Sequence, residues 1–357
     1  MSDHAEHPRP PADAAGSAGT RLLEVEDLHV EFRLPRGTVY AVNGVSYVLD
    51  EGETLAILGE SGSGKSVSAQ AIMGLIDSPP GFVTKGAIRF RGDDVLQMSR
   101  EEHRKLRGPR ISMVFQDALT ALNPVFPVGW QIGEMLRVHR GASRRDARER
   151  AIELMEMVGI PSARTRVGNY PHEFSGGMRQ RVMIAMALAL EPDILIADEP
   201  TTALDVTVQA QVMELLNELQ QETGMGLILI THDLGVVVET ADRVAVMYAG
   251  EIVETGTVEE AFTAPAHPYT EGLMRSIPRL DRKGERLEPI QGAPPLLSNI
   301  PAGCPFHPRC PYATDRCLEE DPPLYDVASG LPITEPLPAP DRRGSACHHF
   351  TEVLRGE

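Results

Sequence analysis

The stretch GESGSGKS, residues 59–66, matches the pattern G-x-x-x-x-G-K-[ST] and determines the predicted fold. It follows the apolar run TLAIL, residues 54–58, which is typical of a buried strand, and it precedes a predicted helix that begins at Lys65. Glycines allow such a loop to curl, so that consecutive N–H groups point at phosphate oxygens near the positive end of the helix dipole. The sequence therefore predicts a nucleotide-phosphate site.

Each position of this loop has an expected role. The backbone N–H groups would surround the phosphates, the lysine would reach the β- and γ-phosphates, and the final serine would ligate Mg²⁺. The residues expected to bind nucleotide here are Gly59, Ser61, Gly62, Ser63, Gly64, Lys65 and Ser66.

A second apolar run, DILIADEP at residues 193–200, ends in two carboxylates. In a fold built on such a loop, Asp198 lies where a carboxylate holds Mg²⁺. Glu199 follows directly and is suited to polarise the attacking water as a general base. The pair predicts nucleotide hydrolysis in addition to binding.

Composition limits the class of protein. The 357 residues carry a formal net charge of −17, which argues against nucleic acid as a partner. The chain has no long uninterrupted apolar run, and its first 20 residues lack the features of a signal peptide, so we expect a cytoplasmic protein. Short β-branched runs alternate with helical segments, which predicts an α/β fold with a parallel sheet.

The expected domain organisation has three parts. Residues 1–20 are rich in Pro, Ala and Gly without periodicity and predict a disordered tail. Residues 21–263 form the predicted ATPase domain, with a mostly helical subdomain at about 117–190. Residues 264–357 are rich in Pro and Gly, contain all four cysteines and predict a loop-rich extension.

Four further motifs resemble those of ABC-type ATPases in order and spacing, from about Leu22 to Gly256. FSGGMRQR at residues 174–181 resembles the signature motif, and VFQD, TALD and ITHD resemble the Q-loop, D-loop and switch regions. The resemblance implies that Gln116 contacts Mg²⁺ and water, that His232 donates to the γ-phosphate, and that Asp205 couples two sites. Mg²⁺ would then be held through Ser66, Gln116 and Asp198.

The signature residues Ser175, Gly176 and Gly177 precede a predicted helix and could offer bare N–H groups to a phosphate. The resemblance implies that two ATPase domains pair head-to-tail, each signature closing over the nucleotide in the other's loop. A serine at this place is also a sufficient helix cap. The expected adenine-stacking residue is Phe32, 33 positions before Lys65 as in relatives, with Tyr40 as the alternative.

The tail, with HPYTEGLMRSIP and CPFHPRC, resembles that of ATP-binding subunits of dipeptide and oligopeptide importers. One departure is Ala118, where this branch usually has proline after FQD. The resemblance implies a peripheral protein on the cytoplasmic face of the membrane. It further implies two transmembrane permease subunits, a second and paralogous ATP-binding subunit, and an extracytoplasmic peptide-binding protein. Import of nickel or another small solute, or a soluble ABC ATPase without transport, are the alternatives.

The cysteines fall at Cys304, Cys310, Cys317 and Cys347, a spacing unlike that of a zinc ribbon or a ferredoxin. Four thiolates suit tetrahedral Zn²⁺ or an iron–sulfur cubane equally well, with His307 and His348 as possible substitutes. The resemblance to the importer branch implies a [4Fe–4S] cluster, which we therefore rank above zinc and above unliganded thiols.

Overall fold

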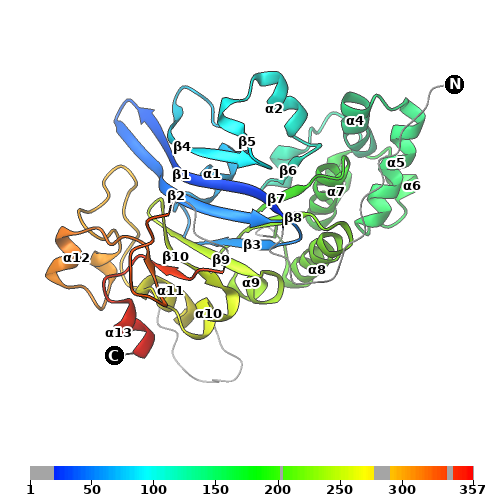
Figure 1. Cartoon of the computed structure of the whole chain (residues 1–357). Coiled ribbons are helices and arrows are strands. Elements are labelled where there is room, and N and C mark those ends of the chain that lie inside the picture. Colours follow the sequence, from blue (N-terminus) through cyan, green and yellow to red (C-terminus); the bar gives the residue numbers. More distant parts are fainter. Residues whose placement is uncertain (1–19, 202–203, 277–289, 336–340, 357) are drawn as a thin grey trace.

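The computed structural model describes residues 20–201, 204–276, 290–335 and 341–356. The expected N-terminal tail lies outside these residues apart from Thr20. The rest forms two sheets with helices at both ends (Figure 1).

The larger sheet has the strand order β11-β12-β10-β9-β3-β8-β7-β6, and its five strands from β9 to β6 are parallel. The parallel strands are short apolar runs buried on both faces, as a sheet covered by helices requires. The eight strands are β3 (Thr54–Leu58), β6 (Ile111–Val114), β7 (Ile194–Asp198), β8 (Gly226–Ile230), β9 (Arg243–Tyr248), β10 (Glu251–Thr257), β11 (Tyr325–Asp326) and β12 (Gly344–Ser345).

The smaller sheet is antiparallel, in the order β2-β1-β4-β5. Its strands are β1 (Arg21–Leu34), β2 (Gly37–Asp50), β4 (Gly81–Phe90) and β5 (Asp93–Asp94). One hydrophobic core lies between this sheet, α1 (Lys65–Ile72) and the parallel strands. The expected α/β fold is thus confirmed, with an added antiparallel sheet.

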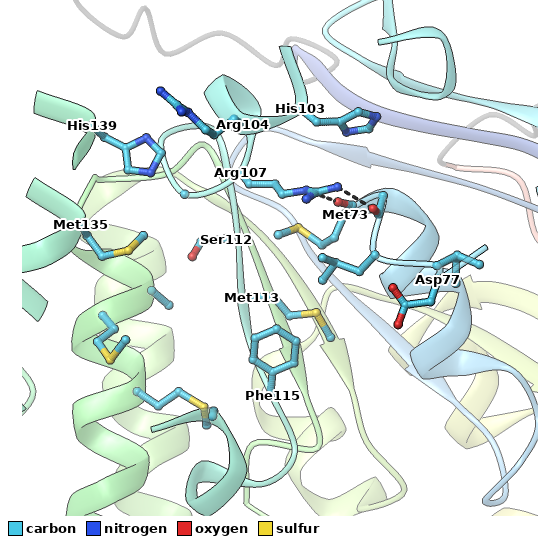
Figure 2. Close-up of a pocket in the computed structure, with 18 of the residues that line it drawn as sticks. Met73, Asp77, His103, Arg104, Arg107, Ser112, Met113, Phe115, Met135 and His139 are labelled. Carbon is cyan, nitrogen blue, oxygen red and sulfur yellow. Dashed lines mark hydrogen bonds between the residues drawn. The ribbon is translucent and has the colours of Figure 1, made fainter. Parts of the chain in front are cut away.

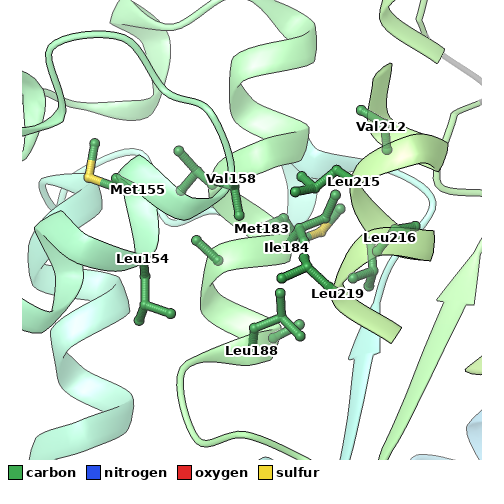
Figure 3. Close-up of a cluster of buried hydrophobic side chains, with 14 of the residues drawn as sticks. Leu154, Met155, Val158, Met183, Ile184, Leu188, Val212, Leu215, Leu216 and Leu219 are labelled. Atoms are coloured by element: carbon green, nitrogen blue, oxygen red, sulfur yellow. The ribbon is translucent and has the colours of Figure 1, made fainter. Parts of the chain in front are cut away.

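A helical lobe lies beside the β6 edge of the large sheet (Figure 1). Side chains of α5, α7 and α8 interdigitate there, among them Leu154, Ile184 and Leu216, each at most 1% exposed (Figure 3). The helices from α2 to α9 are α2 (Arg100–Leu106), α3 (Ala118–Ala121), α4 (Val128–Arg140), α5 (Arg144–Met157), α6 (Ala163–Arg166), α7 (Gly176–Leu188), α8 (Val206–Thr223) and α9 (Leu234–Thr240).

The C-terminal extension lies at the opposite end of the large sheet (Figure 1). Its strand β12 pairs with β10, and Phe306 packs in one core with residues of β9 and of α11. The extension therefore shares both a sheet and a hydrophobic core with the ATPase domain. Its helices are α10 (Val258–Thr263), α11 (Pro268–Arg275), α12 (Asp315–Glu319) and α13 (Phe350–Arg355).

Candidate nucleotide-binding and hydrolysis site

The loop from Gly59 to Gly64 joins β3 to α1, as the sequence predicts. Gly59 has φ 149° and Gly64 has φ 103°, and a Cβ on either would lie 2.2 Å from a backbone carbonyl oxygen. Both positions therefore require glycine, because a side chain would meet both backbone strain and a clash with fixed atoms. These two glycines therefore fix the shape of the loop.

Lys65 is buried at the start of α1. Its Nζ donates hydrogen bonds to the carbonyl oxygens of Gly59 at 2.8 Å and Glu60 at 2.9 Å. Burial lowers the pKa of Lys65, while the carboxylates of Glu199, Asp198 and Glu60 raise it. The lysine thus lies inside the loop, close enough to three carboxylates to interact with their charges.

Ser66 and Asp198 meet across α1 and β7. The Ser66 Oγ donates to Asp198 Oδ1 at 2.9 Å. Burial raises the pKa of Asp198, Ser66 lowers it and Glu199 raises it. A hydroxyl and a carboxylate oxygen side by side are hard oxygen ligands of the kind that Mg²⁺ prefers, so these residues fit the expected metal.

Glu199 lies between the two remaining expected catalytic residues. Gln116 Nε2 donates to one carboxylate oxygen of Glu199 at 2.9 Å, and His232 Nδ1 lies 3.5 Å from the other. The side chain of Glu199 is only 14% exposed, and its backbone adopts φ 44°. Gln116, Glu199 and His232 follow β6, β7 and β8, so the carboxyl ends of neighbouring parallel strands bring them together.

The signature residues lie at the start of α7, in the helical lobe. Ser175 caps this helix, its Oγ accepting the N–H of Met178. A Cβ on Gly177 would lie 2.5 Å from Val208 Cγ1, so glycine there lets α7 pack against the start of α8. Asp205 caps α8 through the Val208 N–H at 3.0 Å. Ser175, Gly177 and Asp205 therefore have local structural roles in a single chain.

The two candidate adenine-stacking aromatics differ in environment. Phe32 packs against the hydrophobic core, and its ring approaches Gly81 of β4. Tyr40 is 50% exposed, and its backbone N–H donates to the Leu297 carbonyl of the extension at 3.1 Å. The choice between the two aromatics remains a prediction.

All four cysteines line one small cavity, together with His307 and His348. Burial, together with neighbouring thiols, raises the pKa of Cys304 to about 11 and of Cys310 and Cys347 to about 12. Within the described residues, however, no group of three or more His, Cys, Asp or Glu side chains is arranged to hold a metal ion. The donor set suits a metal, but its arrangement is not a coordination sphere, so the iron–sulfur expectation remains a prediction.

A cavity of about 910 Å³ lies elsewhere in the ATPase domain (Figure 2). It opens between the end of α1, α2, β6 and the helical lobe. The residues that line it include the apolar Met113, Phe115 and Met135 and also Arg104 and His139. The cavity cannot be the nucleotide site because none of the phosphate-loop residues lines it.

Sequence reasoning missed three residues at the phosphate loop. Glu60 occupies a variable position of the loop motif, Tyr269 lies in α11, and Arg309 lies in the cysteine-rich segment. The Arg309 guanidinium pairs with the Glu60 carboxylate, and the Tyr269 hydroxyl accepts the Glu60 N–H. No sequence signal joins residues 249 positions apart, so only the folded chain reveals this contact.

Fold and site together define a P-loop nucleotide-hydrolysing domain. Residues 42–202 match the family model described as ABC transporter, and residues 253–317 match that of the oligopeptide/dipeptide transporter C-terminal region. The chain belongs to the ATP-binding proteins of the oligopeptide/dipeptide import family of ABC transporters.

The relatives extend over most of the chain. The oligopeptide transport ATP-binding protein OppD of Bacillus subtilis is 55% identical over 323 residues, 90% of this chain and 90% of that protein. The dipeptide transport ATP-binding protein DppD of Escherichia coli is 50% identical over 92% of this chain and 96% of its own length. A dimeric ATP-binding cassette solved in a post-hydrolysis state with ADP and phosphate superposes with a TM-score of 0.60. It is 30% identical, and the match covers 66% of this chain and 99% of that one.

No helix in the described part of the chain is both long enough and apolar enough to cross a membrane.

Proposed function

We propose that this chain hydrolyses ATP to drive the import of dipeptides and oligopeptides through a membrane permease. The observation that carries the proposal is the placement of Glu199 between Gln116 and His232, next to the Ser66–Asp198 pair. Two relatives, OppD of Bacillus subtilis and DppD of Escherichia coli, are named for oligopeptide and dipeptide transport, which favours peptides over nickel or another small solute.

The residues have distinct roles in the proposed reaction. A water oxygen attacks the γ-phosphorus, Glu199 accepts the water proton, and the bond to the ADP oxygen breaks to leave ADP and phosphate. His232 donates a hydrogen bond to the γ-phosphate, and Lys65 leaves its loop carbonyls to contact the β- and γ-phosphates. Mg²⁺ bound through Ser66, Asp198 and Gln116 would supply positive charge to the phosphate oxygens.

The proposed working unit contains two ATPase subunits. Ser175, Gly176 and Gly177 would contact the nucleotide in the loop of a second, paralogous subunit, and Asp205 would link the two sites. The dimeric solved relative supports such an assembly, as does the position of these residues at a helix N-terminus. Each subunit would contact one permease at the cytoplasmic face of the membrane, and an extracytoplasmic binding protein would deliver the peptide.

Transport by the reconstituted complex tests this function. Vesicles that contain both ATPase subunits, the permeases and the binding protein should accumulate a labelled tripeptide only when ATP is present, and Lys65→Ala should abolish the accumulation. Accumulation of nickel without peptide would point to the alternative cargo. ATP hydrolysis by a protein that never copurifies with permeases would point to a soluble enzyme.

The 910 Å³ cavity is the proposed permease docking groove. A few positions after the lining residue Leu122, Val125 is 69% exposed, and the exposed rings of Phe126 and Trp130 stack at 4.3 Å. Apolar side chains together with arginines in the cavity lining suit an amphipathic permease helix that carries an acidic side chain. Phe126→Asp should leave ATP binding intact and abolish transport, whereas Val238→Asp, an exposed control on α9, should not.

The cysteine cavity is the proposed metal centre, with an iron–sulfur cluster as the first assignment and zinc as the alternative. Convergence of four thiols on one cavity supports a metal. Anaerobic purification with an absorption spectrum and iron and zinc analysis distinguishes the two. Cys310→Ser should lower the metal content, and a metal-free wild-type protein would exclude both assignments.

A further inference from the structure

Two residues of the extension, Tyr269 and Arg309, contact Glu60 of the phosphate loop. Arg309 Nη1 lies 2.6 Å from Glu60 Oε2, and Nη2 lies 3.0 Å from Oε1, so the two groups pair through two parallel hydrogen bonds. The Glu60 N–H donates to the Tyr269 hydroxyl at 2.7 Å. Both the side chain and the backbone of Glu60 are therefore held by residues C-terminal to the ATPase core.

Arg309 is fixed by its surroundings. Its side chain is only 4% exposed, and the guanidinium lies 5.8 Å from the ring centre of Tyr248 and 5.9 Å from that of Phe306. A buried guanidinium must have a carboxylate partner, because an unpaired charge in such a place is strongly destabilising. Glu60 is that partner, and the planar two-pronged geometry is one that lysine cannot reproduce.

Glu60 is directly connected to the phosphate site. Its carbonyl oxygen accepts a hydrogen bond from Lys65 Nζ at 2.9 Å. Its carboxylate places a negative charge on the same loop that receives a triphosphate, where a like charge weakens binding unless it is neutralised. The cation that neutralises it comes from the extension.

The extension also borders the loop on a second side. A cavity of about 280 Å³ lies between residues 60–63 of the loop and residues 294–297 of the extension. The backbone of this second segment is bonded to β2 through Leu297 and Tyr40. Two separate parts of the extension thus frame the phosphate loop.

We propose that Arg309 is a positioning residue of the ATP site, which neutralises and orients Glu60 so that the C-terminal extension sets the charge and shape of the phosphate loop. The inference rests on the proposed ATP-binding function of residues 59–66. The proposal adds a role for the C-terminal extension at the ATP site, which the sequence motifs of the ATPase domain do not predict.

Equilibrium titration of the full-length chain with AMP-PNP and Mg²⁺ tests the proposal. Arg309→Met should raise the Kd by about fivefold or more, a usual size for coupling between sites. Adding Glu60→Gln should recover part of this loss, because the unneutralised charge is gone, so the two substitutions are not additive. Arg316→Met removes an exposed ion pair with Glu320 in the same extension and should leave the Kd unchanged.

A second readout separates positioning from general damage. In the intact importer, Arg309→Met should raise KM for ATP while kcat changes less than about twofold, because the residue does not contact Glu199. If Arg309→Met does not fold, Arg309→Lys keeps the charge without the two-pronged pairing and should raise the Kd by about twofold or more.

The outcomes are distinct. A folded Arg309→Met protein with wild-type Kd, strictly additive effects of the two substitutions, or an unchanged Kd for Arg309→Lys would overturn the proposal while leaving the ATPase assignment intact. A wild-type chain that does not bind AMP-PNP would overturn both.

Discussion

Glu251, at the start of β10, is a carboxylate with a raised pKa. Burial, together with the carboxylate of Asp321, raises its pKa from the ordinary 4.5 to about 7, and a hydrogen bond from Asn43 opposes the shift. Because the folded pKa lies above the unfolded one, the protonated carboxyl contributes stability fully below pH 4.5. This contribution is lost as the pH rises through about 7.

Glu251→Gln should therefore be more stable than the wild type at pH 8 and nearly equal to it at pH 5. We expect a difference of about 3 kcal/mol in the free energy of unfolding at the higher pH, because each pKa unit corresponds to about 1.4 kcal/mol. Urea unfolding of both proteins at the two pH values measures it, with the exposed Glu101→Gln as control. Equal stability of the Glu251→Gln and wild-type proteins at both pH values would contradict the assignment.

Single residues also show how far the sequence could predict the site. Lys65, Asp198 and Glu199 could be placed because their chemistry depends on local spacing and on strand ends that a parallel sheet brings together. Arg309 could not, because its partner is 249 positions away and the two meet only after the extension has packed. For Phe32, the spacing from Lys65 predicts adenine stacking, the ring is partly buried against the core, and its role stays a prediction.

At the scale of elements, the pairing of β12 with β10 joins the extension to the ATPase domain. Glu254 of β10 is fully buried at this seam, where it accepts the backbone N–H groups of Ala266 and His267. Arg343 Nη2 lies 3.0 Å from its carboxylate. Burial raises the pKa of Glu254, and these hydrogen bonds and Arg343 oppose the shift.

Arg343→Met should destabilise the protein because it leaves the Glu254 carboxylate buried without a cation. Removing one partner of a buried pair costs about 3 to 5 kcal/mol. Thermal unfolding should show the loss, whereas Arg150→Met, which removes surface pairs with Glu153 and Glu191, should change stability by less than about 1 kcal/mol. A small effect of Arg343→Met would mean that the seam does not depend on this pair.

In its described residues, the C-terminal extension contains only short helices, in agreement with its high content of Pro and Gly. Its helices α12 and α13 have five and six residues, too short to be stable in isolation. Cys317 of α12 packs with Cys304, Phe306 and residues of β9 and α11, and Phe350 of α13 packs with Ala266 and Cys347. The sequence predicts a loop-rich extension from its low regularity, whereas the shared core depends on contacts that no periodicity reveals.

At the scale of the whole molecule, one chain holds the proposed hydrolytic side chains in one place and a signature segment in a different lobe. Gln116, Glu199 and His232 meet at the ends of β6, β7 and β8, whereas Ser175 caps α7. If the signature of one subunit closes over the nucleotide of another, bound ATP should hold the two subunits together. Hydrolysis should then release them.

Glu199→Gln tests both the proposed base and the nucleotide-linked dimer, because it removes the base but retains a hydrogen-bonding side chain of the same shape. Turnover should fall about 10²- to 10⁴-fold. ATP should stay bound, so the paired ATPase subunits should accumulate as a dimer on light scattering when ATP is added. Lys65→Ala should form no such dimer, because it loses a principal phosphate contact.

Turnover of Glu199→Gln near the wild-type rate would show that another group accepts the proton. If the Glu199→Gln protein is inactive but stays monomeric with ATP bound, Glu199 is still supported as the base, and the nucleotide-linked dimer is contradicted.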